Sequence, residues 1–192
     1  MRFMVRNKES KNNRKRLLLY AAGILILFFF LFNSISSLFS IALTVKGQGC
    51  FPYKVWLIRK GVIPKKGEYV AFKNHRVDGQ RTWIKVLTGR EGDQVEVLKF
   101  SPKERYDFFV KDIGKELRVQ GFVVVRNPLD GYKIFMVFEK DTKGRDLPII
   151  DSEGKIPEKK YFVSSPAIRS YDSRYWGLID ESDIIGKAYP LI

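Results

Sequence analysis

The sequence predicts a mainly β domain preceded by one N-terminal transmembrane helix. An uncharged, strongly apolar stretch follows a basic N-terminus. The rest of the chain consists of short β-branched and aromatic runs separated by glycine, proline and polar clusters, which is typical of β-strands and turns. With 192 residues, the chain has room for one ordinary domain beside such an anchor.

The N-terminal region has the charge pattern of a membrane anchor. Residues 1–16 carry seven Lys/Arg and one acidic residue, and no further charged residue occurs before Lys46. The stretch from Leu17 to about Leu38 can cross a hydrocarbon core of roughly 30 Å, since a helix rises about 1.5 Å per residue. A cleaved signal peptide is the alternative, although its apolar region usually has only about 7–15 residues.

The charge asymmetry also predicts the orientation. The positive-inside rule places residues 1–16 in the cytoplasm as a basic segment. We assign the transmembrane anchor to residues 17–42 and an extracytoplasmic domain to residues 46–192. The expected location is the inner (cytoplasmic) membrane, crossed once, with the domain facing the periplasm or exterior.

Seven segments beyond the anchor have the composition of strands, and turn signals such as Asp-Gly and Pro-Lys-Lys-Gly separate them. The predicted strands are Lys54–Ile58, Glu68–Phe72, Thr82–Leu87, Gln94–Leu98, Phe122–Arg126, Lys133–Phe138 and Tyr161–Ser164. Two charged, less regular stretches, 100–119 and 140–160, are expected to be surface excursions from the β core.

The charge of the chain permits two kinds of partner. Subtracting the +6 of residues 1–16 from the net charge of +14 leaves +8 on the remainder. A nucleic-acid-binding domain is one interpretation, but the charges are scattered and no RNA- or DNA-binding motif is present. Attraction to anionic headgroups of the lipid bilayer accounts for the charge equally well, so no nucleic acid partner is expected.

The counts of cysteine and histidine restrict the chemistry. Cys50 is the only cysteine, so an intramolecular disulfide is impossible. His75 is the only histidine and lies in a polar, turn-like segment, which argues against Ser-His-Asp and Cys-His mechanisms and against a His-rich zinc site. We therefore expect no metal and no cofactor, and a hydrolase would need a base other than histidine.

Cys50 follows a glycine-rich stretch and precedes Phe51-Pro52. Glycines allow tight backbone geometry, and the proline favours an extended conformation at Phe51. Such a loop is able to present a nucleophile with its own N–H turned toward an oxyanion. The alternative is a small buried hydrophobic residue, which is the more common role of a free cysteine.

Lys85 lies in a predicted strand whose two faces both carry apolar side chains. Trp83 and Leu87 share its face, and Ile84 and Val86 point the other way. Burial disfavours the charged ammonium and would make the amine a usable base. The alternative is a strand-edge lysine whose ammonium reaches solvent.

Three segments together resemble the type I signal peptidase family, whose members use a serine-lysine dyad. Lys85 is followed by Gly92-Asp93 at the family's spacing. Cys50-Phe51-Pro52 is similar to the nucleophile segment of the branch that processes conjugative pilins, with cysteine in place of serine. The C-terminal segment is similar to the family's D-S-R-x-x-G and I-x-G-K-A signatures, at Asp172–Gly177 and Ile184–Ala188. The resemblance implies a signal-peptidase-like β domain.

The resemblance also implies a role for each matching residue. Cys50 would be the nucleophile and Lys85 the general base, with Ser170 orienting the lysine amine. Asp172 and Arg174 would form a supporting ion pair, although a surface turn is the alternative for this segment. The oxyanion candidates are the side-chain amide of Gln48 and the backbone N–H of Cys50.

Two departures from the family pattern concern the surroundings of the dyad. Val86 stands where many members have arginine, which leaves the Asp172–Arg174 pair with one partner fewer. The usual Gly-Asp-Asn stretch is replaced by Ser164-Ser165-Pro166-Ala167.

The resulting functional hypothesis is a membrane-anchored endopeptidase that processes signal peptides or pilin precursors through a Cys-Lys dyad and an acyl-enzyme. Its expected partner is a membrane-bound precursor or pilin with small side chains before the cleavage site, bound as an added strand. Hydrolysis and pilin cyclisation both remain open. The alternative is a catalytically inactive assembly or scaffold subunit of a pilus or secretion apparatus.

Overall fold

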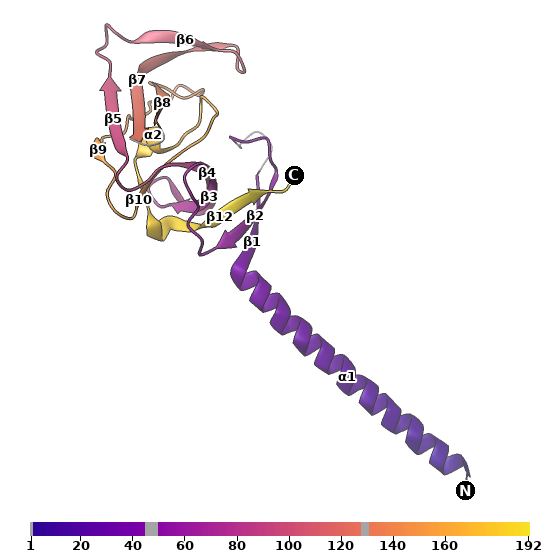
Figure 1. Ribbon diagram of the computed structural model, residues 1–192. Coiled ribbons are helices and arrows are strands. Elements are labelled where there is room, and N and C mark those ends of the chain that lie inside the picture. The colour runs from indigo at the N-terminus through magenta and orange to yellow at the C-terminus, as the bar shows by residue number, and fades with distance from the viewer. Residues whose placement is uncertain (1, 45–49, 128–130) are drawn as a thin grey trace. The chain divides into compact units, whose positions relative to one another are not determined.

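A computed structural model describes residues 2–44, 50–127 and 131–192, with the backbone alone for residues 2–16. The chain divides into two compact units, residues 1–40 and 41–192. The first unit is dominated by one helix and the second by β-sheets, as Figure 1 shows.

Helix α1 (Arg2–Leu38) contains the predicted membrane-spanning stretch. The segment Leu17–Leu38 of this helix has a mean hydropathy of 2.3. Among the described residues, no other helix is long and apolar enough to cross a membrane. The helix ends at Leu38, whereas the anchor was expected to extend to residue 42. Residues Phe39–Leu43 instead form strand β1, because alternating apolar residues can pair at a sheet edge.

The second unit contains two antiparallel sheets. The first has seven strands in the order β1-β2-β12-β3-β4-β10-β11, and the second has the order β6-β7-β5-β9, with β8 paired to β7. The first sheet is formed by β1, β2 (Val55–Lys60), β3 (Tyr69–Asn74), β4 (Asp78–Gly89), β10 (Lys160–Ser164), β11 (Ile179–Asp180) and β12 (Ile184–Pro190). The second is formed by β5 (Gln94–Lys99), β6 (Tyr106–Val110), β7 (Lys115–Asn127), β8 (Gly131–Phe138) and β9 (Gly154–Lys155). Two short helices, α2 (Ser173–Trp176) and the 3-10 helix η1 (Glu181–Asp183), precede β12.

The mainly β prediction is confirmed, and each of the seven predicted strands overlaps an observed one. The stretch 100–119 was predicted to be irregular, but it contains β6 and the first part of β7. Its charged side chains lie on the exposed face of a two-stranded extension, so the strands form without an apolar pattern on both faces.

The two sheets share a hydrophobic core. Phe162 of β10 in the first sheet is fully buried and stacks on Phe135 of β8 in the second, with ring centroids 5.7 Å apart. Val125 of β7 and Tyr175 of α2 belong to the same cluster. This packing places the end of β10 beside the second sheet, which matters for the site described below.

The Gly92-Asp93 pair makes the turn between β4 and β5. Gly92 has a φ of +84°, which favours glycine, and Asp93 is 1% exposed. The Asp93 carboxylate accepts a hydrogen bond from the N–H of Arg90 at 3.0 Å and lies 2.9 Å from the Lys66 amine. The turn thereby fixes the end of the strand that carries Lys85.

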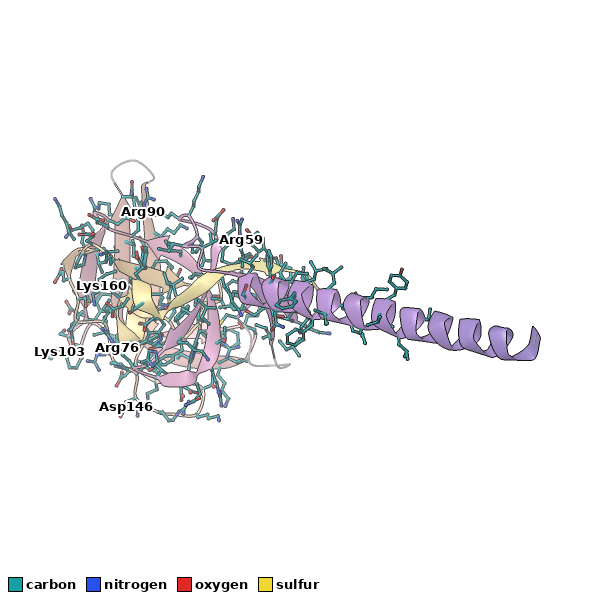
Figure 2. The ribbon with its side chains drawn as sticks, turned by 90° about the horizontal axis from the view of Figure 1, so that it is seen from below. Arg59, Arg76, Arg90, Lys103, Asp146 and Lys160 are labelled. Carbon is teal, nitrogen blue, oxygen red and sulfur yellow. The ribbon has the colours of Figure 1, made fainter. Side chains whose placement is uncertain are left out.

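Several basic side chains of the β unit lie apart from one another. Figure 2 shows the labelled residues Arg59, Arg76, Arg90, Lys103 and Lys160 at separate places around the β unit. A continuous basic stripe, as needed to follow a nucleic acid backbone, is therefore not formed by these residues.

Gly186 of β12 lies so close to the backbone of Arg59 that a side chain at this position would clash with it. A Cβ at this position would lie 2.0 Å from the carbonyl oxygen of Arg59, and backbone cannot rotate away. We expect Gly186→Ala to lower the free energy of unfolding by more than about 2 kcal/mol. The measurement is urea unfolding of the full chain in detergent micelles, followed by tryptophan fluorescence.

Gly114→Ala is the control for this prediction. Gly114 has a φ of +60° and open space around it, so only backbone strain of about 1 kcal/mol is expected. Equal losses in the two variants would contradict the steric explanation for Gly186.

Candidate active site

Cys50, Lys85 and Ser170 come together although 120 residues separate the first from the last. The Lys85 amine nitrogen (Nζ) lies 3.0 Å from the Cys50 sulfur (Sγ) and 2.6 Å from the Ser170 hydroxyl oxygen (Oγ). The Cys50 sulfur lies 3.4 Å from the same hydroxyl oxygen. The three polar groups form a closed triangle of hydrogen-bonding contacts.

The fold positions Lys85 at a point where the neighbours of β4 change. On one edge Lys85 is opposite Val70 of β3. On the other edge β10 pairs with β4 only from Val86 onward, opposite Ser164. The chain leaves β10 beside Lys85 and continues directly to Ser170. Lys85 itself is only 2% exposed.

Aromatic packing and one hydrogen bond hold Cys50 in place. The ring of the next residue, Phe51, makes edge contacts with Trp56 at 5.7 Å and Tyr69 at 5.1 Å. The Ser165 hydroxyl donates a hydrogen bond of 3.3 Å to the carbonyl oxygen of Cys50. Together these contacts fix the backbone from Cys50 to Phe51.

The electrostatic surroundings favour the thiolate form of Cys50. Burial raises the pKa of the Cys50 thiol, but the positive charge and hydrogen bond of Lys85 oppose this, and Ser170 adds a second hydrogen bond. The net direction is a pKa below the ordinary value of 9.0. A lowered pKa increases the thiolate fraction near neutral pH, and the thiolate is the nucleophilic form.

Asp172 and Arg174 form a buried, bidentate ion pair beside this triangle. Arg174 Nε and Nη2 donate to the two carboxylate oxygens of Asp172 at 2.8 and 2.9 Å. The side chains are 0% and 2% exposed. The remaining nitrogen, Nη1, donates to the carbonyl oxygens of Met136 at 3.0 Å and Ile168 at 3.1 Å. A surface turn, the alternative for this segment, is therefore wrong.

The Arg174 guanidinium stays charged in this environment. Burial lowers the pKa of Arg174, but the adjacent Asp172 carboxylate outweighs burial, and the net direction is upward. A permanently charged guanidinium and its carboxylate can therefore act as a rigid support for the segment that carries Ser170.

Ser165 was not predicted as a site residue, although it connects the ion pair to Cys50. Its N–H donates to Asp172 at 3.3 Å, and its hydroxyl donates to the carbonyl of Cys50. The substituted stretch Ser164-Ser165-Pro166 was the only sequence signal for it. Gln48, the predicted side-chain oxyanion donor, lies outside the described residues.

His75 forms no hydrogen bond or ion pair with Cys50, Lys85 or Ser170 among the described residues. Its side chain is 71% exposed and lies in the turn after β3, 3.7 Å from Asp183. This placement agrees with its prediction as a loop residue, and the amine nearest to the thiol belongs to Lys85.

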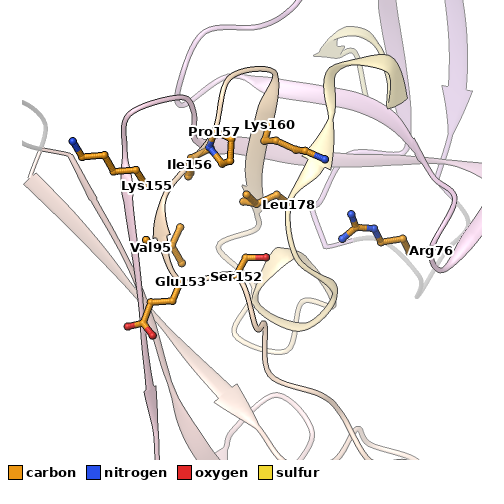
Figure 3. Close-up of a pocket in the computed structure, with 10 residues that line it drawn as sticks. Arg76, Val95, Ser152, Glu153, Lys155, Ile156, Pro157, Lys160 and Leu178 are labelled. Atoms are coloured by element: carbon orange, nitrogen blue, oxygen red, sulfur yellow. The ribbon is translucent and has the colours of Figure 1, made fainter.

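A hollow of about 200 Å³ on another part of the domain is lined by both polar and apolar residues, such as Ser152 and Leu178. Figure 3 shows Lys155 and Glu153 pointing away from its centre, and Arg76 and Lys160 on the other side. Arg76 is engaged by the carbonyl of Trp176, and Lys160 forms an ion pair with Asp180. The residues that line this hollow do not include Cys50, Lys85 or Ser170.

The Cys50–Lys85 geometry is sufficient for proton transfer. One hydrogen bond of 3.0 Å joins the thiol and the amine, which is the reach required between a nucleophile and its base. The base is oriented by a third group, the Ser170 hydroxyl. The arrangement can therefore support covalent catalysis without a histidine or a metal ligand.

Comparisons with known proteins agree with this geometry. A family model described as "Signal peptidase, peptidase S26" matches residues 14–192. Signal peptidase I of Haemophilus influenzae strain Rd is 27% identical over 142 residues, which cover 67% of this chain and 36% of the relative. The chain thus spans about a third of the length of that relative.

The reactivity of Cys50 should depend on the charge of Lys85. The rate of alkylation by iodoacetamide should rise with pH through a midpoint below 9.0 in the wild type, because the pKa of the thiol is lowered. In Lys85→Met the positive charge that lowers the pKa of the Cys50 thiol is lost, while the burial that raises this pKa remains. The midpoint should therefore move to higher pH. The measurement is the alkylation rate of the full chain by intact mass across a pH series.

Lys99→Met is the matched control, since Lys99 is exposed and contacts the exposed Asp151 and not the thiol. It should leave the midpoint unchanged. A midpoint that does not move in a folded Lys85→Met protein would show that the thiol and the amine are not electrostatically coupled.

Proposed function

Because the chain belongs to the signal peptidase family, peptidase S26, we propose that it is a membrane-anchored endopeptidase with Cys50 as nucleophile and Lys85 as general base. The single observation that carries the proposal is the contact of 3.0 Å between the Lys85 amine and the Cys50 sulfur. Both groups lie at the junction between β4 and the segment that follows β10.

In the first step the Lys85 amine takes the proton of the Cys50 thiol. The resulting thiolate attacks the carbonyl carbon of the scissile peptide bond, and negative charge develops on the carbonyl oxygen. The backbone N–H of Cys50 and the Gln48 amide are the proposed donors to this oxyanion. One such donor contributes about 3 kcal/mol of transition-state stabilisation in comparable hydrolases.

In the second step the tetrahedral adduct collapses to a thioester. The Lys85 ammonium returns its proton to the departing amine, and the C–N bond breaks. The neutral Lys85 amine then accepts a proton from water, whose oxygen attacks the thioester. Collapse of this adduct releases the carboxylic acid and regenerates the thiol, while Ser170 keeps the amine in place throughout.

The proposed substrate is a membrane-tethered precursor protein. A shared bilayer raises the effective concentration of an anchored substrate near an anchored enzyme. The basic residues 1–16 favour a cytoplasmic N-terminus, which would put the β unit in the periplasm or exterior, where translocated precursors emerge.

A pilin precursor is the finer proposal within this class. The Cys50-Phe51-Pro52 segment resembles the branch that matures conjugative pilins. A thioester favours this role, because thioesters react more readily with amines than oxygen esters do. Attack by an amino group of the same pilin would give a cyclic product with a new amide bond and would release the Cys50 thiol.

A catalytically inactive scaffold subunit is the competing function. The buried amine argues against it, since a scaffold gains nothing from placing a lysine nitrogen between a thiol and a hydroxyl. Cleavage by the purified chain separates the two functions.

Cleavage should require both members of the dyad. We expect no product with Cys50→Ala and a loss of at least about 1,000-fold with Lys85→Ala. Lys85→Arg should not restore activity, because a guanidinium stays protonated and cannot accept the thiol proton. The measurement is intact-mass analysis of a membrane-tethered precursor incubated with each variant, with melting curves to confirm folding. Near-wild-type cleavage by a folded Lys85→Ala protein would refute the dyad.

The orientation can be tested independently of activity. Protease added to intact spheroplasts should digest the β unit, since we expect residues 46–192 outside the cytoplasm. Replacing the seven basic residues in 1–16 by glutamine should reduce this accessibility. A β unit that resists digestion until the membrane is dissolved would overturn the orientation.

A further inference from the structure

A groove of about 600 Å³ lies between β8 and the segment 165–168. Its walls are mainly apolar. One wall is formed by Ile134, Phe135 and Met136 of β8, and the other by Pro166, Ala167 and Ile168.

The groove is continuous with the residues that surround the Cys-Lys pair. Ser165 lines the groove and also donates its hydroxyl to the carbonyl of Cys50. Ala167 also lines the groove, and its carbonyl oxygen accepts a hydrogen bond of 2.9 Å from the Ser170 N–H. Arg174 lines it and donates to carbonyls on both walls. A chain that passes Cys50 therefore meets the groove within a few residues.

The outer edge of β8 is suited to pairing with an extended peptide. Met136 C=O accepts from Arg174 and Phe138 N–H donates to the Tyr175 hydroxyl, so the peptide groups of these alternate residues face away from β7. Ile134, two residues before Met136, faces the same way. Within the part of the chain that the structure describes, no partner contacts its N–H or C=O from that side. An added strand can use these free groups.

The side of the scissile bond that reaches the groove follows from the chemistry. The Lys85 ammonium gives its proton to the departing amine, so the departing nitrogen lies on the Lys85–Ser170 side of the thiol. The segment that carries Ser170 is also a wall of the groove. The acyl part of the substrate is left with the edge of β4 before Val86, which β10 does not cover.

We propose that this groove binds the segment of the substrate that follows the scissile bond, as a strand added to β8, and selects apolar side chains there. The inference rests on the proposed peptidase function, because that function defines which segment departs. Ile134 is the residue expected to contact the first apolar side chains, since it is 56% exposed on the groove wall.

The test measures binding separately from cleavage. Fluorescent six-residue peptides with a free N-terminal amine represent the departing segment, with leucine or serine at positions one and three. They are titrated by anisotropy against the full-length Cys50→Ala protein in detergent micelles. The leucine peptide should bind at least about 10-fold more tightly than the serine peptide, because it buries apolar surface.

Ile134→Asp in the same background should remove this preference and favour a lysine peptide instead. Ile63→Asp is the matched control. Ile63 is also an exposed isoleucine, 43% accessible, and it lies between β2 and β3 outside the groove. This control should leave the preference unchanged, and melting curves should show both variants folded.

The outcomes separate the groove from the peptidase. Equal binding of the leucine and serine peptides, or no effect of Ile134→Asp, would overturn the groove proposal even if the wild type cleaves precursors. A second peptide, with a blocked N-terminus, represents the acyl segment. If its binding depended on Ile134, the assignment of the groove to the departing side would be overturned. Ile134-dependent binding without cleavage by the wild type would retain the groove as a peptide-binding site, but it would overturn both the peptidase and the assignment of the groove to a departing segment.

Discussion

The geometry of the site depends on the buried ion pair between Asp172 and Arg174. Removing two charges from water costs several kcal/mol per ion, so such a pair persists only with further hydrogen bonds. Here the bidentate contact is completed by the Ser165 N–H on the carboxylate and by two backbone carbonyls on the guanidinium. The pair thereby joins the segment after β10 to β8 of the second sheet. Ser170 lies inside this clamped segment, and its hydroxyl is held 2.6 Å from the Lys85 amine.

The use of cysteine changes what the buried amine must do. A thiol ionises at a far lower pH than an alcohol, so in the proposed mechanism less basicity is required of the lysine than in a serine-lysine pair. Burial alone would raise the pKa of the Cys50 thiol, and the adjacent Lys85 charge reverses that effect. The same contact stabilises both charges, because thiolate and ammonium neutralise one another in a water-poor site.

Much of the fold could be predicted from local patterns, and the exceptions have physical causes. The seven predicted strands have the composition of strands, but β6 (Tyr106–Val110) lies within a stretch rich in charged residues and β12 lacks a regular alternation. β12 lies between β2 and β3 and reaches this position through Gly186, whose missing side chain allows the backbone of Arg59 to approach. Long-range pairing of this kind is not encoded in a short window of sequence. Strand β1 was not predicted for a similar reason, because it is stabilised by its place in the sheet.

The site was less accessible to sequence reasoning than the fold. Local patterns left Cys50 and Lys85 with structural alternatives, and only the family resemblance linked them to Ser170. The absence of an arginine at Val86 suggested a weakened ion pair, yet the Asp172 carboxylate accepts the Ser165 N–H and the guanidinium donates to the carbonyls of Met136 and Ile168. Backbone acceptors carry no signature in the side-chain sequence, so neither this compensation nor the groove beside it was predictable. Arg174 donates to a carbonyl on each wall of the groove. The contacts that hold the Asp172–Arg174 pair therefore also hold the two walls of the groove together.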